Sequence, residues 1–325
     1  MAPACDIAAD ALGIFLEGLL LPCETLLALL VCSLSSAEPA IHHYALANMS
    51  TKTTSETLPA TLTTALPRLH VRSPAKTKQQ QARPSMLDLF SEPSSSETLV
   101  RGLSYATDGK KVPAGDCLGT LLHVDLWKAT DEMPGRQDHV AELDLRRPSS
   151  LLAASASADP GDTIFIVNLQ VPGTPFVHVV SYWRLSAEAL ASDAKFAGLF
   201  TRFQSNEPEA QSFQDARFKL VPTIVDGPWL IKAAVPQKPA ITGKKLTQRY
   251  FVGSNYVEVD MDIGSSAIAS NIVSLCRGYA ERLVVDLSLT LQGNSDAELP
   301  ERIFGSVRFS HLDLTLATAM PPRSP

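Results

Sequence analysis

The chain has 325 residues and a formal net charge of -6, from 28 basic and 34 acidic side chains. This mild, mixed charge gives no support for electrostatic binding of nucleic acid, so we expect no nucleic-acid partner. The five cysteines are an odd set without a C-x-x-C pair, which argues against a disulfide framework or a zinc knuckle and favours a reducing compartment. We therefore expect a cytoplasmic protein, and we expect any contact with a membrane to be peripheral.

Residues 1–36 are rich in leucine and predict a helical segment. Acidic residues and Pro22 interrupt this segment before it reaches the ~20 apolar residues that a spanning helix needs. No Lys or Arg precedes Lys52, so the basic start of a secretory signal is missing. Residues 37–97 are rich in Ser, Thr, Pro, Ala and Gln without sustained periodicity, which is typical of a disordered linker. We expect the folded domain at 98–318 and a loose tail at 319–325.

The first half of this domain predicts a strand at 118–127, an exposed polar segment at 131–147 and a short helix at 149–158. Two β-branched and aromatic runs at 163–171 and 176–183 flank a Pro-Gly-Thr-Pro loop, which indicates a hairpin. Apolar residues at helical spacing then predict a helix at 186–203. The segment 207–216 is polar and leads into the next strand.

That strand begins at Arg217 and ends at the turn Asp226-Gly227-Pro228-Trp229. Alternation predicts strands at 257–263 and 283–291, and a helix at 268–279 lies between them, preceded by the capping hydroxyls of Ser265 and Ser266. A last strand runs through 307–312. These elements predict an α+β fold, in which a curved, mainly antiparallel sheet of about seven strands carries two or three helices. By analogy alone, such an arrangement can enclose a START-like cavity.

Glu258, Asp260 and Asp262 alternate with apolar residues, so their carboxylates share one face of a strand. Such a row can hold a divalent ion with help from elsewhere. Alternatively, the row pairs with basic side chains of the preceding hairpin, and each such pair stabilises by ~0.2 to 1 kcal/mol. We favour the ion-paired face, whose basic candidates are Lys244, Lys245 and Arg249.

Trp229 follows a rigid Gly-Pro turn and has two interpretations. The ring can close one end of the core. Alternatively, it lines the mouth of an apolar cavity, where Lys232 reaches an anionic headgroup. The candidate ligand-binding residues are therefore Trp229, Lys232 and Arg249.

Catalytic signatures are absent from the sequence. It contains no G-x-S-x-G, G-x-G-x-x-G or H-E-x-x-H motif. The seven histidines show no metal-ligand spacing in the folded part. We expect a protein that is not an enzyme, with no cofactor, no metal site and no catalytic residues.

Residues 98–316 resemble the C-terminal domain of plant ENHANCED DISEASE RESISTANCE 2 proteins, a domain of unknown function. Several matching segments occur in the same order, which is more specific than any single motif. The segments are Lys110 to Gly115, Phe165 to Pro172, Phe218 to Lys232, Lys238 to Tyr250, Asn255 to Ser266, Leu299 to Gly305 and His311-Leu312-Asp313.

The resemblance implies a function at membranes, because full-length members carry a pleckstrin-homology domain, a START lipid-binding domain and this domain, and act as negative regulators of defence and cell death. The hundred residues before the matching region are too few and too irregular for both upstream domains, so the lipid binding of those domains is not carried over. We expect a non-enzymatic regulatory domain that associates with lipid or a membrane surface. The alternative is a protein-interaction scaffold with a solid core and no small ligand.

Overall fold

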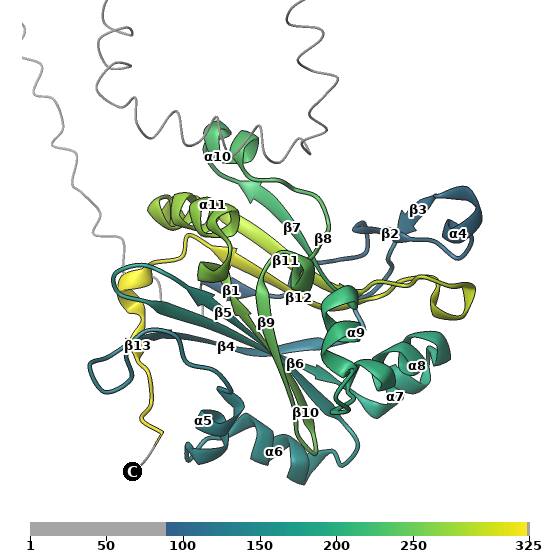
Figure 1. The fold of residues 1–325 in the computed structure, drawn as a ribbon, viewed down its shortest axis with the longest axis horizontal. Coiled ribbons are helices and arrows are strands. Elements are labelled where there is room, and N and C mark those ends of the chain that lie inside the picture. Colours follow the sequence, from purple (N-terminus) through teal and green to yellow (C-terminus); the bar gives the residue numbers. More distant parts are fainter. Residues whose placement is uncertain (1–88, 324–325) are drawn as a thin grey trace, which may run out of the picture. The chain divides into compact units, whose positions relative to one another are not determined.

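The computed structural model of the protein describes residues 89–323, which belong to one compact unit. The helical prediction for 1–36, and the linker prediction for 37–97 up to residue 88, lie outside these residues. The described part combines helices with mainly antiparallel strands, which confirms the α+β class (Figure 1).

The strands are β1 (Phe90–Ser91), β2 (Leu99–Arg101), β3 (Lys111–Pro113), β4 (Thr120–Lys128), β5 (Thr163–Val171), β6 (Val177–Leu185), β7 (Phe218–Asp226), β8 (Ala240–Ile241), β9 (Thr247–Val252), β10 (Tyr256–Asp262), β11 (Val284–Leu291), β12 (Ile303–Ser310) and β13 (Thr318–Ala319).

The α-helices are α4 (Tyr105–Asp108), α5 (Ala141–Arg146), α6 (Leu151–Ala158), α7 (Ala187–Ala191), α8 (Ala194–Phe203), α9 (Ala210–Arg217), α10 (Trp229–Ala234) and α11 (Ala267–Gly278). Short 3-10 helices are η2 (Thr242–Lys244), η3 (Ile263–Ser265), η4 (Ala280–Arg282), η5 (Asp296–Glu298) and η6 (Leu314–Leu316).

The strands divide into two large sheets rather than the one sheet that the sequence predicts. The five-stranded sheet has the order β1-β12-β11-β7-β8, and the six-stranded sheet has the order β13-β4-β6-β5-β10-β9. A separate pair joins β2 to β3. Most pairs are antiparallel, but β10 pairs with β5 in parallel and β13 pairs with β4 in parallel.

The hairpin of β5 and β6 forms the centre of the six-stranded sheet, as the two apolar runs predict. Its register extends without a break from Thr163 opposite Leu185 to Val171 opposite Val177. Both strands are buried along most of their length on both faces. This burial explains why the runs show little alternation between apolar and polar residues.

The main core fills the space between the two sheets with aromatic rings. The ring of Phe165 on β5 lies 4.8 Å from the ring of Phe304 on β12 and 5.9 Å from that of Phe218 on β7. Helix α8 adds Phe200 and Phe203, whose rings are each 6.2 Å from the Phe165 ring. Phe165 therefore joins both sheets and a helix.

A second core lies on the outer face of the six-stranded sheet. Val140 at the start of α5 and Ala141 and Leu143 within it are fully buried there, and Leu152 of α6 packs beside them. The prediction that 131–147 is exposed is therefore wrong, because this segment covers one face of the sheet. In Figure 1, α5 and α6 lie together on the side away from α10 and α11.

The ordered structure also extends past both predicted ends of the domain. Strand β1 pairs with β12, and Leu89 is buried before it, so ordered residues begin upstream of 98. Met320 is buried, and Arg323 forms an ion pair with Glu142. The tail up to residue 323 is therefore packed, in contrast to the loose tail predicted.

Two further segments differ from the prediction in detail. The helix expected at 186–203 is broken into α7 and α8, because Asp193 caps α8 by accepting a hydrogen bond from the amide of Phe196. The polar segment 207–216 contains α9. The cap predicted before α11 is confirmed, since the Ser266 hydroxyl accepts from the amide of Ala269.

Within residues 89–323, no helix is both long enough and apolar enough to cross a membrane.

Candidate functional site

The acidic row of β10 lies on the outer face of the six-stranded sheet. Glu258 and Asp260 are both fully buried there, beneath the segment 135–141 that leads into α5. The opposite face of the same strand carries Val257, Val259 and Met261 into the main core. The predicted alternation is therefore confirmed, but neither face of the strand is open to solvent.

The two carboxyl groups bind backbone amides of the covering segment. Glu258 accepts hydrogen bonds from the amides of Val140 and Ala141 at 2.7 and 2.8 Å. Asp260 accepts from the amide of His139 at 2.8 Å and from the side-chain amide of Asn168 at 2.8 Å. All four carboxyl oxygens of the pair are therefore already hydrogen-bonded.

Burial raises the pKa values of both carboxyl groups. Burial raises the pKa of Glu258 well above its ordinary value, and the neighbouring Asp260 raises it further. Burial also raises the pKa of Asp260, to about 6, while a hydrogen bond from Glu258 lowers it. Burial therefore favours the neutral form of the two groups, whereas the amide donors of the covering segment favour the ionised form.

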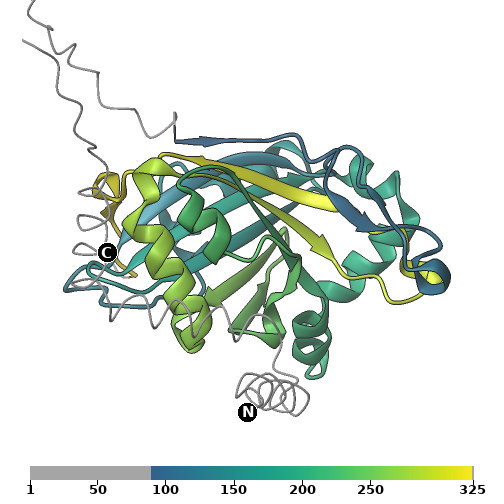
Figure 2. The ribbon, with the colours of Figure 1, turned by 90° about the horizontal axis from the view of Figure 1, so that it is seen from above.

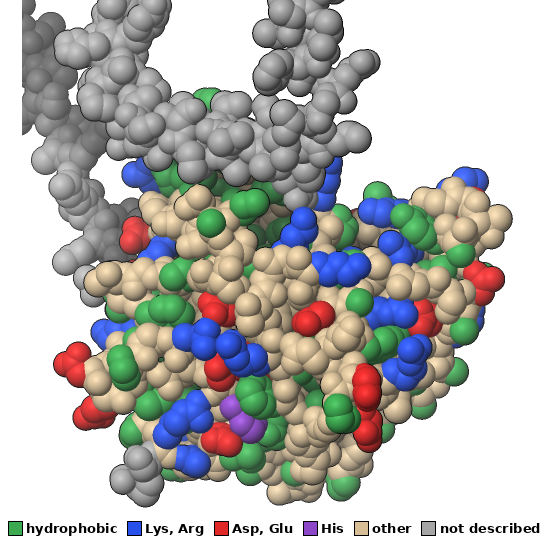
Figure 3. Space-filling model, in the orientation of Figure 1, with side chains coloured by type: hydrophobic (Ala, Val, Ile, Leu, Met, Phe, Trp, Pro, Cys, Tyr) green, Lys and Arg blue, Asp and Glu red, His purple; other side chains and the backbone are tan. Residues whose placement is uncertain are grey.

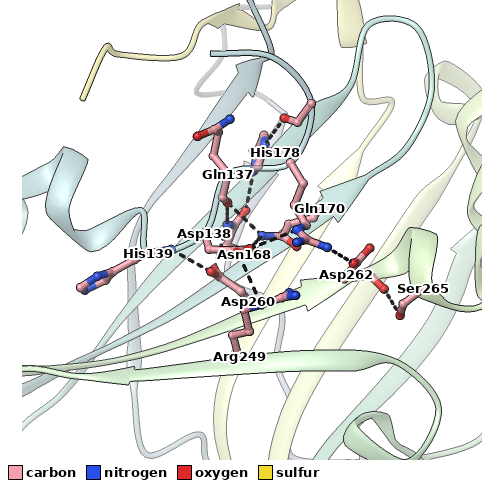
Figure 4. A network of polar contacts seen from close by, with 12 residues as sticks. Gln137, Asp138, His139, Asn168, Gln170, His178, Arg249, Asp260, Asp262 and Ser265 are labelled. Carbon is pink, nitrogen blue, oxygen red and sulfur yellow. Dashed lines mark hydrogen bonds and ion pairs between the residues drawn. The ribbon is translucent and has the colours of Figure 1, made fainter. Parts of the chain in front are cut away.

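A network of polar contacts extends from Asp260 through the neighbouring strands and the covering segment (Figure 4). His178 contacts the side-chain oxygen of Asn168 at 3.0 Å and the carbonyl of Gly135 at 3.2 Å. The carbonyl of Gln137 accepts from both Asn168 and Gln170, at 3.1 and 2.9 Å. Burial lowers the pKa of His178 to about 4, while the carbonyl of Gly135 and the charge of Asp138 act against that shift.

The outer rim of the network contains the ion pairs. Asp262 pairs with Arg136, whereas Arg249 lies 3.4 Å from Asp138. Arg249 stands opposite Asp260 in the strand register, as the hairpin interpretation predicts. However, within residues 89–323 Arg249 pairs with Asp138 rather than with Asp260, and the carboxyl oxygens of Glu258 and Asp260 accept from amide groups. Three of the four donors to this pair are backbone amides, which the sequence did not predict.

His139 is the strained residue of this segment. Its φ of 58° lies in the left-handed region, which is uncommon for a residue with a side chain. Its ring stacks on Phe251 with centroids 4.2 Å apart, and its Nε2 lies 2.8 Å from the Tyr256 hydroxyl. These contacts and the amide bond to Asp260 hold the unusual backbone. The arrangement positions a covering segment over the sheet and offers no free carboxylate for chemistry.

Trp229 and Lys232 lie elsewhere, on α10, so the structure does not bring the three predicted ligand-binding residues together. Trp229 is 79% exposed. The interpretation that its ring closes the core is therefore wrong. Lys232 is exposed too, and its Nζ donates to the carbonyl of Val225 at 3.3 Å.

The turn before α10 explains why the tryptophan projects. Gly227 has a φ of 150°, and a Cβ atom there would lie 2.4 Å from the side chain of Leu283. The turn is therefore packed closely on the chain before β11. Ile231 is fully buried two residues after Trp229. At 100° per residue the two side chains point to opposite sides of the helix, so burying Ile231 exposes Trp229.

Two more apolar side chains are exposed beside Trp229. Val225 at the end of β7 is 42% exposed and Leu230 is 37% exposed. We call Val225, Trp229 and Leu230 the α10 tip. In Figure 3, acidic and basic side chains are mixed over the visible face below this edge.

Comparison with known proteins identifies the domain. A family model described as "Protein ENHANCED DISEASE RESISTANCE 2, C-terminal" matches residues 90–313. The chain belongs to this family. An Arabidopsis thaliana protein described as "Protein ENHANCED DISEASE RESISTANCE 2-like" is 36% identical over 218 residues. The match covers 67% of this chain and 28% of the relative, so the chain matches little more than a quarter of the relative's length. No solved structure matches the chain.

The ENHANCED DISEASE RESISTANCE 2 match contains both the acidic network and the α10 tip, since it spans 90–313. The sequence pointed to Trp229 through its Gly-Pro turn, but the acidic strand itself gave no sign that its row would be buried. The partners of that row come from 135–141, a segment whose charged residues resemble a surface loop. The signal that could have revealed it is the apolar pair Val140 and Ala141, followed by Leu143 at helical spacing.

Proposed function

We propose that this domain is a non-enzymatic module that associates peripherally with membranes through the α10 tip. The observation that carries the proposal is the exposure of Trp229, 79%, on a helix whose opposite side is anchored by Ile231. Family membership supports a regulatory rather than a catalytic role, as expected from the resemblance. All four carboxyl oxygens of Glu258 and Asp260 already accept hydrogen bonds, which supports the absence of acid-base chemistry at this strand.

The chemistry of the tip suits an interface between lipid and water. Tryptophan has a large apolar body and a polar N–H group, and it is enriched at membrane interfaces. Full burial of a large apolar side chain contributes about 1.5–3 kcal/mol, so insertion of Trp229 and Leu230 contributes a few kcal/mol. Such an anchor is weak and reversible, as for single lipid anchors, which suits peripheral contact.

Intrinsic fluorescence gives a direct test, because the chain has three tryptophans. Trp127 and Trp183 are buried, so the solvent-sensitive emission comes from Trp229. Phosphatidylcholine vesicles should shift the emission of the full chain to shorter wavelengths, and brominated lipid should quench it. In co-sedimentation, Trp229→Ala should lower the partition coefficient at least about tenfold, which corresponds to 1.4 kcal/mol.

The matched control is Leu103→Ala, since Leu103 is 59% exposed and lies outside the tip. This variant should bind vesicles like the parent chain. Absence of any vesicle binding by the parent would end the proposal. If the parent instead recruits a protein through Trp229 and ignores vesicles, the domain is the interaction scaffold.

A further inference from the structure

An open groove lies next to the α10 tip. It has a volume of about 440 Å³ and is formed by the C-terminal end of α11, by η4 and by the segment that follows β12. This volume falls in the usual range of ligand sites, ~300–1,000 Å³. The lining residues that matter here are Arg277, Tyr279, Glu281, Arg282, Leu312 and Leu314.

The groove and the tip share one piece of backbone. Asp226, which precedes the turn of α10, pairs with Val284 across the strands β7 and β11. A Cβ atom on Gly227 would lie 3.5 Å from the carbonyl of Arg282, which lines the groove. Tyr279 lines the groove and also packs into the small core that contains Ile231. In Figures 1 and 2, α10 and α11 lie side by side.

Arg277 is a cation without a counter-charge in the described part of the chain. Its guanidinium donates to the carbonyls of Pro172 and Pro175, at 3.4 and 2.6 Å, and packs on Gly173. No carboxylate within residues 89–323 forms an ion pair with it. Burial lowers its pKa, and no acidic group offsets that effect. Two carbonyl contacts use part of its five donors, so donors remain for a ligand.

Arg282 is exposed. Within the described residues, 89–323, its side chain forms no ion pair and no hydrogen bond. Glu281 also lines the groove, so the side chains at the rim carry a net charge of about +1. Arginine is suited to phosphate, because its planar fork donates two parallel hydrogen bonds.

Part of the lining is apolar and fixed. Leu312 and Leu314 form this wall and also pack against the main core. His311, with a φ of 52°, anchors this wall because its amide donates to the carbonyl of Leu283 at 2.8 Å. Its Nδ1 also lies 3.2 Å from the carbonyl of Glu281. The wall is therefore tied to η4, and the groove combines two arginines with an apolar side.

We infer that this groove binds the phosphate-bearing headgroup of an anionic lipid, with Arg277 and Arg282 as its ligands. The inference deepens the proposed function and rests on it. A lipid is favoured over free phosphate because the apolar wall matches the glycerol and upper acyl carbons. The position of the groove beside the tip also places it at the membrane surface when Trp229 inserts.

The test uses the full chain with two kinds of vesicle, pure phosphatidylcholine and phosphatidylcholine with 20% phosphatidic acid. Arg282→Gln should lower the partition coefficient on the anionic vesicles about fivefold and leave binding to the neutral vesicles unchanged. Arg282 is exposed, so the variant should fold like the parent. The matched control is Lys110→Gln, an exposed lysine of the β2–β3 connection, which should change neither value.

Arg282→Lys separates a site from a diffuse charge effect. It keeps the positive charge but loses the two-donor fork, so it should still bind phosphatidic acid vesicles more weakly than the parent. Equal binding of Arg282→Lys and the parent would overturn the site. So would equal binding of Arg282→Gln and the parent.

Two outcomes distinguish this inference from the proposed function. If the parent binds neither kind of vesicle, the proposed function fails and the groove fails with it. If the parent binds both and Arg282 substitutions have no effect, only the groove fails. Inorganic phosphate at millimolar concentration should not displace the chain from anionic vesicles. Displacement by phosphate would assign the groove to a free anion rather than a lipid.

Discussion

The buried carboxyl pair on β10 makes the stability of this domain depend on pH. The pKa of Asp260 is raised to about 6 from 3.8, mainly by burial, and the pKa of Glu258 is raised further. A raised pKa means that the folded chain holds the proton more tightly than the unfolded chain. The contribution is therefore fully present below pH 3.8, and the contribution of Asp260 is lost as pH rises through about 6.

We predict that Asp260→Asn weakens the fall in stability between pH 4 and pH 7. The shift of Asp260 corresponds to on the order of 3 kcal/mol at 1.36 kcal/mol per pKa unit. The measurement is the free energy of unfolding in urea at several pH values, with parent and variant compared at each. The comparison is needed because Glu298 has a lowered pKa and acts in the opposite direction. Identical pH profiles for the two proteins would contradict the raised pKa of Asp260.

The burial of this pair could not be read from the sequence, although the strand itself could. Alternation placed Glu258 and Asp260 on one face, and that face is confirmed. Whether a face meets solvent or another segment depends on contacts far apart in the chain, here with His139 to Ala141. Ionisable residues are almost never fully buried unless paired, so the exposed, ion-paired face was the natural expectation.

The secondary elements were easier to predict than their contacts. The hairpin β5–β6, the helix α11 and the strand β11 all follow from local periodicity and turn residues. The covering segment was misjudged because its polar residues outnumber Val140, Ala141 and Leu143. The sequence also could not show that the strands form two sheets rather than one. Sheet membership depends on pairing between residues far apart in the chain, such as Ile164 of β5 and Tyr256 of β10.

A glycine marks the place where the two sheets meet. A Cβ atom on Gly119, just before β4, would lie 2.3 Å from the carbonyl oxygen of Phe304 on β12. The neighbouring amide of Leu118 donates to the carbonyl of Ile303 at 3.0 Å, so the two backbones are in contact. The obstacle is backbone rather than a flexible side chain, so the strands themselves have to move apart to admit a methyl group.

We predict that Gly119→Ala destabilises the domain by about 1–3 kcal/mol, the usual cost of overpacking. The matched control is Gly198→Ala in α8, where an added Cβ meets no atom within 4 Å. Alanine in place of glycine within a helix should stabilise by roughly 0.5–1 kcal/mol. Thermal unfolding of both variants checks the pair. If Gly119→Ala loses no stability, or if Gly198→Ala loses stability as well, the close contact of Gly119 with the Phe304 carbonyl does not determine the cost of the added methyl group.

At the scale of the whole molecule, the domain is a two-sheet α+β fold with separate polar and apolar features on its surface. The acidic network closes the outer face of one sheet, while the α10 tip and the groove lie on the edge of the other. The START-like cavity stays a prediction, since the hollow described beside α11 is an open groove rather than an enclosed space. Aromatic rings occupy the region between the sheets.

The filled interior leads to the last prediction, on Phe165. Its ring contacts Phe304 and Phe218 from the five-stranded sheet and Phe200 and Phe203 from α8. Phe165→Ala should therefore lower the free energy of unfolding by about 3–5 kcal/mol, from lost burial and from the cavity left behind. The exposed Leu103→Ala should change it by less than about 0.5 kcal/mol.

Chemical denaturation with circular dichroism measures both variants. A loss under about 1 kcal/mol for Phe165→Ala would mean that the space between the sheets is already loosely filled. That result would favour the cavity-forming arrangement over the solid core. A loss near the expected value, together with vesicle binding that still depends on Trp229, would place lipid contact at the surface of the domain rather than in its interior.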